Sequence, residues 1–463
     1  MMHRTIALLL LTTALGGCSL WDQWTKPEVA QPTNWQSTND GTGVWPDTTW
    51  WRGFGSAELD RLMGEASTGN LDMRAAVARV KQAQANARIA GAAIYPTLDA
   101  DASASRTTRF ARPQTTSTTN YQAGLTVGYE VDLFGRIQST QGAALSRLEG
   151  SRFDQETLAL TVNASVALTY FQLLALRERI ELATESLNTS RRLLLLLVEQ
   201  RRIGTASDLE VAQQRVSVAQ QSAAIPALRQ VERQTLSTLA LLLGRLPQNF
   251  EIAGQRLSAI NAPQVIGGIP SEVLFRRPDV RSAEAGLKAS NLDIAAARAA
   301  RFPRIQLTAD GGTASAAFSG LFGPGSFLLT LAGGLTAPIF EGGRLKAQQE
   351  LSQARYEELM ETYRTATLSA FRDVENALSG ATQYRLQLAA AREARTQARE
   401  AYRLADLRFR AGTVDFLTVL DAQRSIIQTD DAVVQAQLSQ LASLVDLYKA
   451  LGGGWDGKLP PPP

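Results

Sequence analysis

The sequence predicts a mixed α/β membrane protein built from two tandem structural repeats, each with two β-strands and one long helical hairpin. Three observations lead to this fold class. Segments of the first half recur in the second half, the apolar residues change period within each half, and several stretches without glycine or proline are longer than ordinary helices. With 463 residues, the chain has room for two or three ordinary domains or for one architecture made of repeats.

Residues 1–17 have the features of a bacterial lipoprotein signal peptide. His3 and Arg4 form the charged end, a short apolar core follows, and the run "LGGC" ends at Cys18. The core is too short to span a bilayer, and cleavage before the cysteine would free its thiol for a lipid such as palmitate. We therefore expect Cys18 to anchor the chain in outer membrane lipid of a Gram-negative bacterium, to which Ser19 permits export. The less favoured alternative is a secretory signal beside a buried free cysteine.

Residues 18–55 are expected to form an extended, lipid-anchored leader. Six of the seven tryptophans lie in it, together with several prolines, so a helix is disfavoured. Some of the indole rings could lie at the lipid interface. Docking of these rings onto the protein's own helices is the favoured alternative, because buried indoles contribute a large apolar area.

After the leader the chain repeats itself. "ARIAGAAIYPTLDADAS" from Ala87 is echoed by "IAAARAARFPRIQLTADG" from Ile294, and "VDLFGRIQ" from Val131 by "PIFEGGRLK" from Pro338. The offset is 207 or 208 residues throughout, too long for a solenoid repeat. The sequence therefore predicts one duplicated unit, with the following segments: repeat 1 at 56–245, an equatorial segment at 246–275, repeat 2 at 276–452, and a C-terminal tail at 453–463.

Each repeat contains a pair of segments in which apolar and polar residues alternate, as in half-buried strands. We expect strands at about 97–110 and 120–133, and, with a weaker pattern, at about 303–316 and 326–339. The polar face carries four acids, which we expect to face a wet barrel lumen: Asp99, Asp101, Glu130 and Asp132. By pattern alone, an amphipathic sheet on a soluble core is equally well supported. Four strands cannot close a membrane barrel, so several chains would have to share one.

Long helices lie between the strands. Residues 151–203 contain neither glycine nor proline and would reach roughly 80 Å as a helix, which suits coiled coils or tubes better than a globular core. Gly204 and Gly412 are placed as helix C-caps, and "SDLE" from Ser207 as a capping box that opens the next helix. Each repeat is thus predicted to contain an antiparallel helical hairpin, with its tip near 204 or 412.

The residue inventory argues against catalysis. The only histidine is His3 and the only cysteine is Cys18, so histidine-dependent triads and zinc sites with nitrogen or sulfur ligands are excluded downstream. We expect no enzyme, no catalytic residue, no metal and no cofactor. The formal charge of +3 is spread over interleaved acids and bases, which indicates no nucleic-acid partner. "RRPD" from Arg276 is interpreted as the start of a helix whose arginines form ion pairs.

Five segments together resemble a known family. They are "WWRGFGSAELDRLM", "IPSEVLFRRPDVRSAEAGLKASN", "APIFEGGRLKA", "AGTVDFLTVLDAQRS" and "LYKALGGGW", in that order, and they span about Trp50 to Trp455. They resemble the signature segments of TolC-like outer-membrane factors, of the NodT-type lipoprotein branch. Only the leader and the final prolines fall outside the resemblance.

The resemblance implies a homotrimer. Three chains of four strands each would form a twelve-stranded transmembrane β-barrel, continued into the periplasm by a long α-helical barrel. The chain would then be the passive exit duct of a tripartite efflux pump for drugs or other small molecules. Its partners would be a periplasmic adaptor, that is, a membrane fusion protein, and an inner-membrane pump of the RND type.

The resemblance also assigns residues to a periplasmic gate. In similar proteins the second hairpin carries a leucine ring, an aspartate ring and an arginine, and the matching positions are Leu417, Asp421 and Arg408. Three converging carboxylates would repel one another and hold cations. Aligning "DAQR" with "AQQR" puts Asp421 opposite Ala212. Without the resemblance, Asp421 would be interpreted as a solvated surface acid.

The tips themselves are candidates for adaptor contact: Gly204, Thr205, Gly412 and Thr413. Glycine caps and N-terminal threonines also occur in any helical hairpin, so a purely structural role remains an alternative.

Two other functions of the whole protein stay open as well. A duct for type I protein secretion or for metal ions is one, although five methionines are too few for a soft-metal relay. A periplasmic coiled-coil lipoprotein without a pore is the other.

Overall fold

The computed structural model describes residues 24–30, 32, 34–36, 47–110, 112, 114–254, 256–263 and 276–459. The predicted signal peptide and Cys18 lie outside these residues, as does part of the segment 246–275. The chain divides into two compact units. Unit 1 comprises residues 1–28, 79–151 and 282–364, and unit 2 comprises residues 29–78, 152–281 and 365–463.

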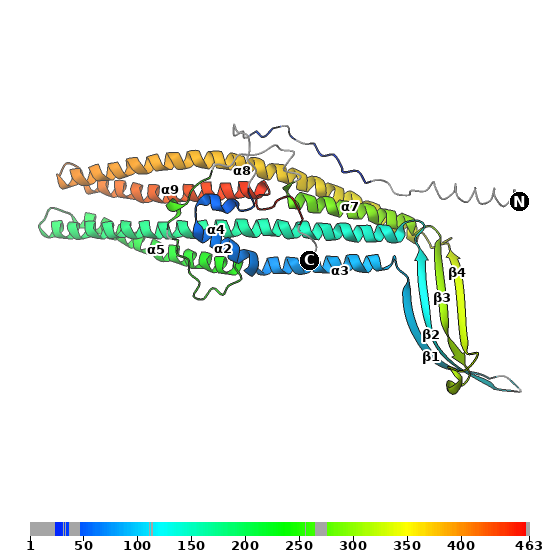
Figure 1. Cartoon of the computed structure of the whole chain (residues 1–463). Helices are drawn as coiled ribbons and strands as arrows, with labels where there is room; N and C mark the ends of the chain where they lie inside the picture. The colour runs from blue at the N-terminus through cyan, green and yellow to red at the C-terminus, as the bar shows by residue number, and fades with distance from the viewer. Residues whose placement is uncertain are drawn as a thin grey trace. The chain divides into compact units, whose positions relative to one another are not determined.

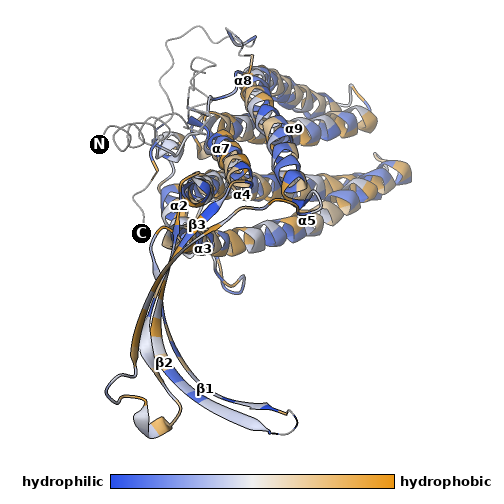
Figure 2. Cartoon of the chain, turned by 90° about the vertical axis from the view of Figure 1, so that its right-hand side faces the viewer, coloured by the Kyte–Doolittle hydropathy of each residue, from blue (hydrophilic) through white to orange (hydrophobic). Residues whose placement is uncertain are grey.

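Unit 1 contains a single four-stranded antiparallel sheet among its described residues, in the order β1-β2-β3-β4. The strands, and a short turn of helix between β3 and β4, have these bounds: β1 Thr97–Arg109, β2 Thr116–Val131, β3 Arg304–Ser315, η3 Phe318–Gly320 and β4 Phe327–Thr336. Compared with the sequence prediction, β2 begins earlier, at 116, and β4 ends earlier, at 336. Figure 2 shows hydrophobic and hydrophilic residues mixed along the strands.

The helices confirm the predicted duplication. Their bounds are α2 Ala57–Gly69, α3 Leu71–Ala92, α4 Arg136–Arg202, α5 Asp208–Leu242, α7 Pro278–Ala299, α8 Arg344–Arg410 and α9 Phe416–Ala450, with 3-10 turns η1 Trp50–Phe54 and η2 Leu257–Ala259. Helices α4 and α8 both have 67 residues, and α5 and α9 both have 35. In unit 2, α4 runs beside α5 and α8 beside α9 (Figure 1). These pairs are the two expected hairpins.

Helix α4 begins well before residue 151, where the glycine-free stretch starts. It includes both Gly142 and Gly150. A Cβ at Gly142 would lie 3.2 Å from a methyl group of Leu292 in α7. The cost of a glycine in a helix is offset here by the close approach of the two helices, which a larger side chain would prevent.

Among the described helices, α4 is also the one whose length and composition would allow it to cross a membrane, but 56% of that apolar stretch is buried.

The core of unit 2 is aromatic where the leader meets the helices. Trp50 stacks on Tyr448 of α9 with ring centroids 4.9 Å apart, and Phe54 lies 5.0 Å from Phe171 of α4. Trp35 is buried against Phe371 of α8. These leader side chains therefore dock onto the protein's own helices, which is the alternative that the sequence favoured.

Candidate functional site

The four-stranded sheet has one polar face, and the strand register places acids on it. Asp99 of β1 is paired with Thr126 of β2, which is paired with Asp310 of β3, and Asp310 is paired with Thr330 of β4. The Thr126 hydroxyl donates a hydrogen bond to Asp310 at 2.8 Å. Asp101 lies two residues from Asp99 and therefore on the same face. A continuous row of oxygen-bearing side chains thus crosses all four strands.

Asp310 is a residue that the sequence reasoning missed. It alternates with Gln306 and Thr308 along β3, so the period-two pattern contained the signal. The glycines at 311 and 312, which follow it, weaken that pattern. Only the register with β2 shows that Asp310 shares a face with Asp99.

The other two predicted acids lie where strand β2 joins helix α4. Glu130 is within β2, and its carboxylate accepts two hydrogen bonds of 2.9 Å from the guanidinium of Arg136. Asp132 follows the strand, and its carboxylate accepts a hydrogen bond of 2.8 Å from the backbone N–H of Gln138. Both acids therefore stabilise the first turn of α4, where carboxylates interact favourably with the free N–H groups and the helix dipole.

The opposite face of the sheet is apolar and exposed in the single chain. The strand register places on it Leu98, Leu125, Leu307, Phe327, Leu329, Leu331 and Leu335. Leu331 has 74% of its surface exposed, and Phe327 has 66%. An apolar surface of this extent is not stable in water, so the face must contact lipid or protein.

Aromatic rings flank the apolar face at both ends. At the end where the strands join the helices, Phe134 stacks on Phe302 with centroids 4.7 Å apart, and Phe340 is 89% exposed. At the far end, Tyr121 lies 5.7 Å from Phe318. Two aromatic bands separated by an apolar strand face are typical of transmembrane β-strands, because aromatic rings favour the membrane–water interface.

The first hairpin tip joins α4 to α5. Gly204 has a φ of 78°, and its N–H donates to the carbonyl of Arg201, while the N–H of Thr205 donates to the carbonyl of Gln200 at 2.8 Å. Ser207 then caps α5 in a capping box with Glu210. The predicted C-cap and capping box are both confirmed.

The second tip joins α8 to α9 and has the same geometry. Gly412 has a φ of 71°, and Thr413 donates to the carbonyl of Arg408 at 2.9 Å from its N–H and at 3.0 Å from its hydroxyl. Asp415 caps α9 by accepting from the N–H of Thr418 at 3.0 Å and from its hydroxyl at 2.6 Å. The hydrogen bonds from the side chain and then the backbone of Thr418 lower the pKa of Asp415, so this cap stays charged.

The predicted gate residues lie on the exposed side of the second tip. Leu417 is 49% exposed, and Asp421, one helical turn later, has a side chain that is 63% exposed and lies 3.4 Å from Arg424. The side chain of Arg408 is exposed and forms no ion pair with a described residue. The structure of one chain thus presents Leu417 and Asp421 on one outward face but brings neither into contact with Arg408.

The inward side of the second tip packs in a separate apolar cluster. This cluster contains Leu193, Leu197, Val211, Ala405, Phe416, Val419 and Leu420. It draws residues from all four helices of the two hairpins, so it fixes the outward direction of the face that carries Leu417.

The helix bounds change the residue that was aligned with Asp421. Helices α5 and α9 have the same length, and they start at the equivalent residues Asp208 and Phe416. Asp421 therefore corresponds to Gln213 in the first hairpin, not to Ala212 as the sequence alignment placed it.

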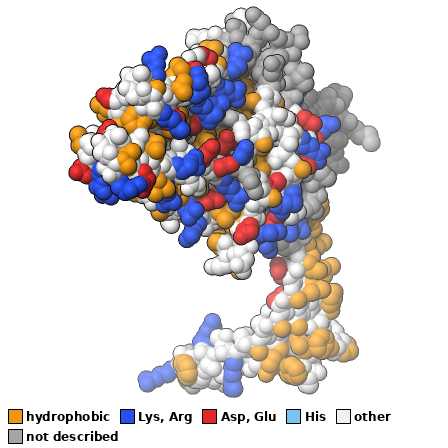
Figure 3. Space-filling model, turned by 90° about the vertical axis from the view of Figure 1, so that its left-hand side faces the viewer, with side chains coloured by type: hydrophobic (Ala, Val, Ile, Leu, Met, Phe, Trp, Pro, Cys, Tyr) orange, Lys and Arg blue, Asp and Glu red, His pale blue; other side chains and the backbone are white. Residues whose placement is uncertain are grey.

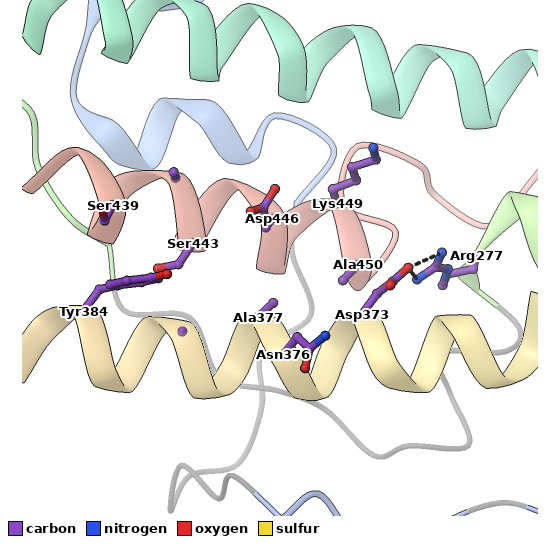
Figure 4. Close-up of a pocket in the computed structure, with 12 residues that line it drawn as sticks. Arg277, Asp373, Asn376, Ala377, Tyr384, Ser439, Ser443, Asp446, Lys449 and Ala450 are labelled. Atoms are coloured by element: carbon purple, nitrogen blue, oxygen red, sulfur yellow. Dashed lines mark hydrogen bonds and ion pairs between the residues drawn. The ribbon is translucent and has the colours of Figure 1, made fainter. Parts of the chain in front are cut away.

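A cavity of about 550 Å³ lies between α8 and α9 in unit 2 (Figure 4). Arg277, just before α7, is directed at Asp373 of α8 at 3.2 Å, and it also binds Asp279 at 2.6 Å. Burial alone would lower the pKa of Arg277, but the hydrogen bonds and charges of the two aspartates raise it above its usual value. The predicted ion-pair role of this motif is therefore confirmed for Arg277, and Pro278 begins α7 as expected.

No group of three or more His, Cys, Asp or Glu side chains that could hold a metal ion occurs among the residues that the structure describes. Asp310, Glu130, Asp132 and Asp415 are instead paired with a hydroxyl, a guanidinium group or a backbone N–H group. The arrangement offers two surfaces, a polar one and an apolar one, rather than a convergent catalytic pocket.

An amphipathic sheet bounded by aromatic bands, together with two long helical hairpins, defines the class of outer-membrane channel subunits. The outer membrane efflux protein family matches residues 62–245 and 269–453, and the chain belongs to this family. It is 40% identical to the pyoverdine export outer membrane protein OpmQ of Pseudomonas putida over 467 aligned positions, covering 99% of both chains.

Solved structures agree with this assignment. The outer-membrane channel OprN superposes with a TM-score of 0.89 at 26% identity, covering 95% of this chain and 100% of that one. The open state of the MtrE outer membrane channel of Neisseria gonorrhoeae has a TM-score of 0.87 at 32% identity, covering 94% of this chain and 98% of that one. The predicted family, the two-repeat fold and the outer-membrane location are therefore confirmed. The protein is an efflux channel of a Gram-negative outer membrane, not an enzyme.

Proposed function

We propose that three copies of this chain form the exit duct of a tripartite efflux pump, closed at the hairpin tips by Leu417, Asp421 and Arg408 until an adaptor binds. One observation carries this proposal. The amphipathic four-stranded sheet ends in β1 on one side and β4 on the other, with no further strand among the described residues.

These open edges are long. Strand β1 has 13 residues and β4 has 10, so each edge exposes a row of N–H and C=O groups. In hydrocarbon such groups must be paired, because each unpaired group costs several kcal/mol. Pairing β4 of one copy with β1 of the next satisfies both edges, and three copies give twelve strands, above the minimum of about eight for a membrane barrel.

The polar face then lines the lumen. Asp99, Asp101 and Asp310 would line a water-filled passage, while Leu329 and Leu331 would contact lipid. Glu130 and Asp132 would lie at the inner mouth of the barrel, where they also hold the first turn of α4.

The gate proposal rests on the outward face of the second tip. Leu417 is exposed in one chain although an apolar cluster lies beside it, and Asp421 is exposed one helical turn later on the same face. Around a three-fold axis each would form a ring, with the leucines closing the passage to water and the carboxylates holding cations. Arg408 would pair with a neighbouring copy.

The tips would also receive the partners. Gly204, Thr205, Gly412 and Thr413 lie at the ends of the hairpins, and a Cβ added at either glycine would meet no atom of the chain within 4 Å. This open backbone fits contact with a periplasmic adaptor, coupled to an inner-membrane pump of the RND type. The similarity to a pyoverdine exporter supports a small-molecule cargo. Cys18 would carry the lipid anchor.

Conductance through a planar bilayer tests the gate. Wild type, Asp421→Ala and the matched variant Gln213→Ala, at the equivalent place in the first hairpin, would be compared with and without divalent cation. We expect small wild-type currents that rise in Asp421→Ala and lose their sensitivity to divalent cation, whereas Gln213→Ala behaves as wild type. Equal currents from all three proteins would refute the carboxylate gate. A monomer in detergent with no conductance would refute the trimeric duct itself.

A further inference from the structure

The outer end of the β1–β2 hairpin is strongly basic. Residues 102–129 contain Arg106, Arg109 and Arg112 but no acid, and residues 311–340 contain no charged side chain at all. Figure 3 shows blue side chains at the far end of the strands, beyond the orange apolar ones. The hairpin end therefore carries an uncompensated positive charge.

This basic segment extends past the rest of the sheet. The pairing of β2 with β3 ends at Tyr121 and Ser315, whereas β1 and β2 remain paired as far as Arg109 and Thr116. The five residues of β2 from Thr116 to Asn120 correspond to about 17 Å of two-stranded ribbon, at roughly 3.4 Å per residue. Arg106 and Arg109 both lie on this extension.

The register gives the level of Arg106 relative to a membrane. The apolar face of β2 runs from Tyr121 to Val131, which matches the roughly 9 to 11 residues that a tilted strand needs to cross the hydrocarbon. Tyr121 with its neighbour Phe318 marks the outer interface. Arg106 lies two residues beyond Ala104, the partner of Tyr121, and on the same lipid-facing side. It is therefore at the height of the lipid headgroups.

The three arginines are exposed, and none forms an ion pair or hydrogen bond with another side chain of the described residues. A guanidinium offers a planar fork of donors that fits phosphate oxygens in a bidentate manner. We propose that this basic hairpin end, through Arg106 on its lipid-facing side, binds the phosphate groups of outer-leaflet lipid headgroups and so fixes the height of the channel in the membrane, with Arg109 and Arg112 adding to the positive charge there. This inference rests on the strands crossing the outer membrane.

Attraction of anionic cargo at the exit is the competing explanation. It fits Arg109, which shares the polar face with Asp99 and Asp101, but not Arg106, whose side of the strand carries Leu98 and Ala104. A soluble anion in the lumen cannot reach a side chain on the lipid-facing side. Arg106 is therefore the residue that distinguishes a lipid site from a cargo site.

The test measures lipid retained by the full-length protein. Wild type, Arg106→Gln and the triple variant R106Q/R109Q/R112Q would be reconstituted in phosphatidylcholine vesicles that contain either diphosphoryl lipid A or its dephosphorylated form. Arg304→Gln is the matched control, because Arg304 is an exposed arginine at the opposite end of the same sheet. Retained lipid would be counted by native mass spectrometry after extraction into detergent.

We expect wild type and Arg304→Gln to retain the phosphorylated lipid in preference to the dephosphorylated one. Arg106→Gln should reduce that preference about fivefold, the effect of one basic residue near an anionic membrane surface, and the triple variant should abolish it. No preference in wild type, or an unchanged preference in the triple variant, would overturn the proposal. An unchanged preference in Arg106→Gln would also overturn it, since it would place the phosphate site away from the lipid-facing side of the strand. Unchanged channel conductance in the triple variant would separate this result from any failure of the duct.

Discussion

Gln423 of α9 donates a hydrogen bond of 2.7 Å to the hydroxyl of Ser190 in α4, which ties the second helical hairpin to the first in the interior of unit 2. The same hydroxyl accepts a hydrogen bond of 2.7 Å from Gln221 of α5, and the Ser190 carbonyl accepts one of 2.9 Å from Gln214. Yet the side-chain oxygens of Gln214 and Gln423 are buried and have no partner in the described part of the chain. One serine thus joins three helices within a polar layer that is only partly satisfied.

This layer predicts opposite effects for two substitutions. Ser190→Ala leaves the buried amide of Gln423 without its acceptor, so it should destabilise the helices by about 1 to 3 kcal/mol. Gln423→Met removes the donor together with the unpaired oxygen and keeps the volume, so it should be neutral or stabilising. Thermal unfolding followed by circular dichroism of the helices would measure both. Ser425→Ala, an exposed serine of α9, is the control and should leave the midpoint unchanged.

The tip glycines predict a loss of transport without a loss of folding. Gly412→Asp places a charged side chain in open space, because a Cβ there meets nothing within 4 Å. Its only internal cost is the left-handed backbone, about 1 kcal/mol. We expect trimers to remain in the membrane while drug resistance of cells that depend on this channel is lost, because the adaptor can no longer dock. Gly457→Asp has the same left-handed, open environment in the C-terminal tail and should retain resistance. If Gly412→Asp cells lacked trimers, the docking explanation would be wrong.

Much of this fold could be predicted because its signals are local. The alternation of apolar and polar residues predicted the strands. The glycine caps and the capping box at Ser207 predicted the hairpin tips, because each of these signals depends on a few neighbouring residues. The starts of the long helices could not be predicted, because Gly142 is tolerated only through the approach of α7. Nor could the polar layer be predicted. A glutamine such as Gln423 has the pattern of a surface residue until three helices meet around it, so it is tertiary packing that makes it interior.

The leucine of the second tip predicts an asymmetry between the repeats. Leu417 and Leu209 occupy the same place in α9 and α5, one residue inside each helix, and both are exposed. If only the second hairpin narrows the passage, Leu417→Ser should raise single-channel conductance, because a polar side chain admits water into an apolar constriction. Leu209→Ser makes the same chemical change in the first hairpin and should leave the conductance unchanged. A rise in both variants would show that the constriction is shared by the two hairpins.

A half-buried acid in unit 2 predicts a pH-dependent change in stability. Burial, and to a smaller extent the charge of Asp456, raise the pKa of Glu156 above its ordinary value of 4.5. The folded state therefore binds a proton more readily than the unfolded state, so folding stability falls as pH rises from 4.5 through the folded-state pKa. Glu156→Gln removes this penalty. It should raise the unfolding midpoint at pH 7 relative to wild type, and the two proteins should converge at pH 4.

Asp456 supplies the internal control for this prediction. Its carboxylate accepts a hydrogen bond of 2.9 Å from the N–H of Lys458, which Asp456→Asn can still accept through its carbonyl oxygen. In the Asp456→Asn background the charge repulsion is absent and burial alone remains, so the gain from Glu156→Gln at pH 7 should be smaller but still present. A gain of equal size at pH 4 and pH 7 would mean that the substitution acts through packing and that the ionisation of Glu156 does not limit stability.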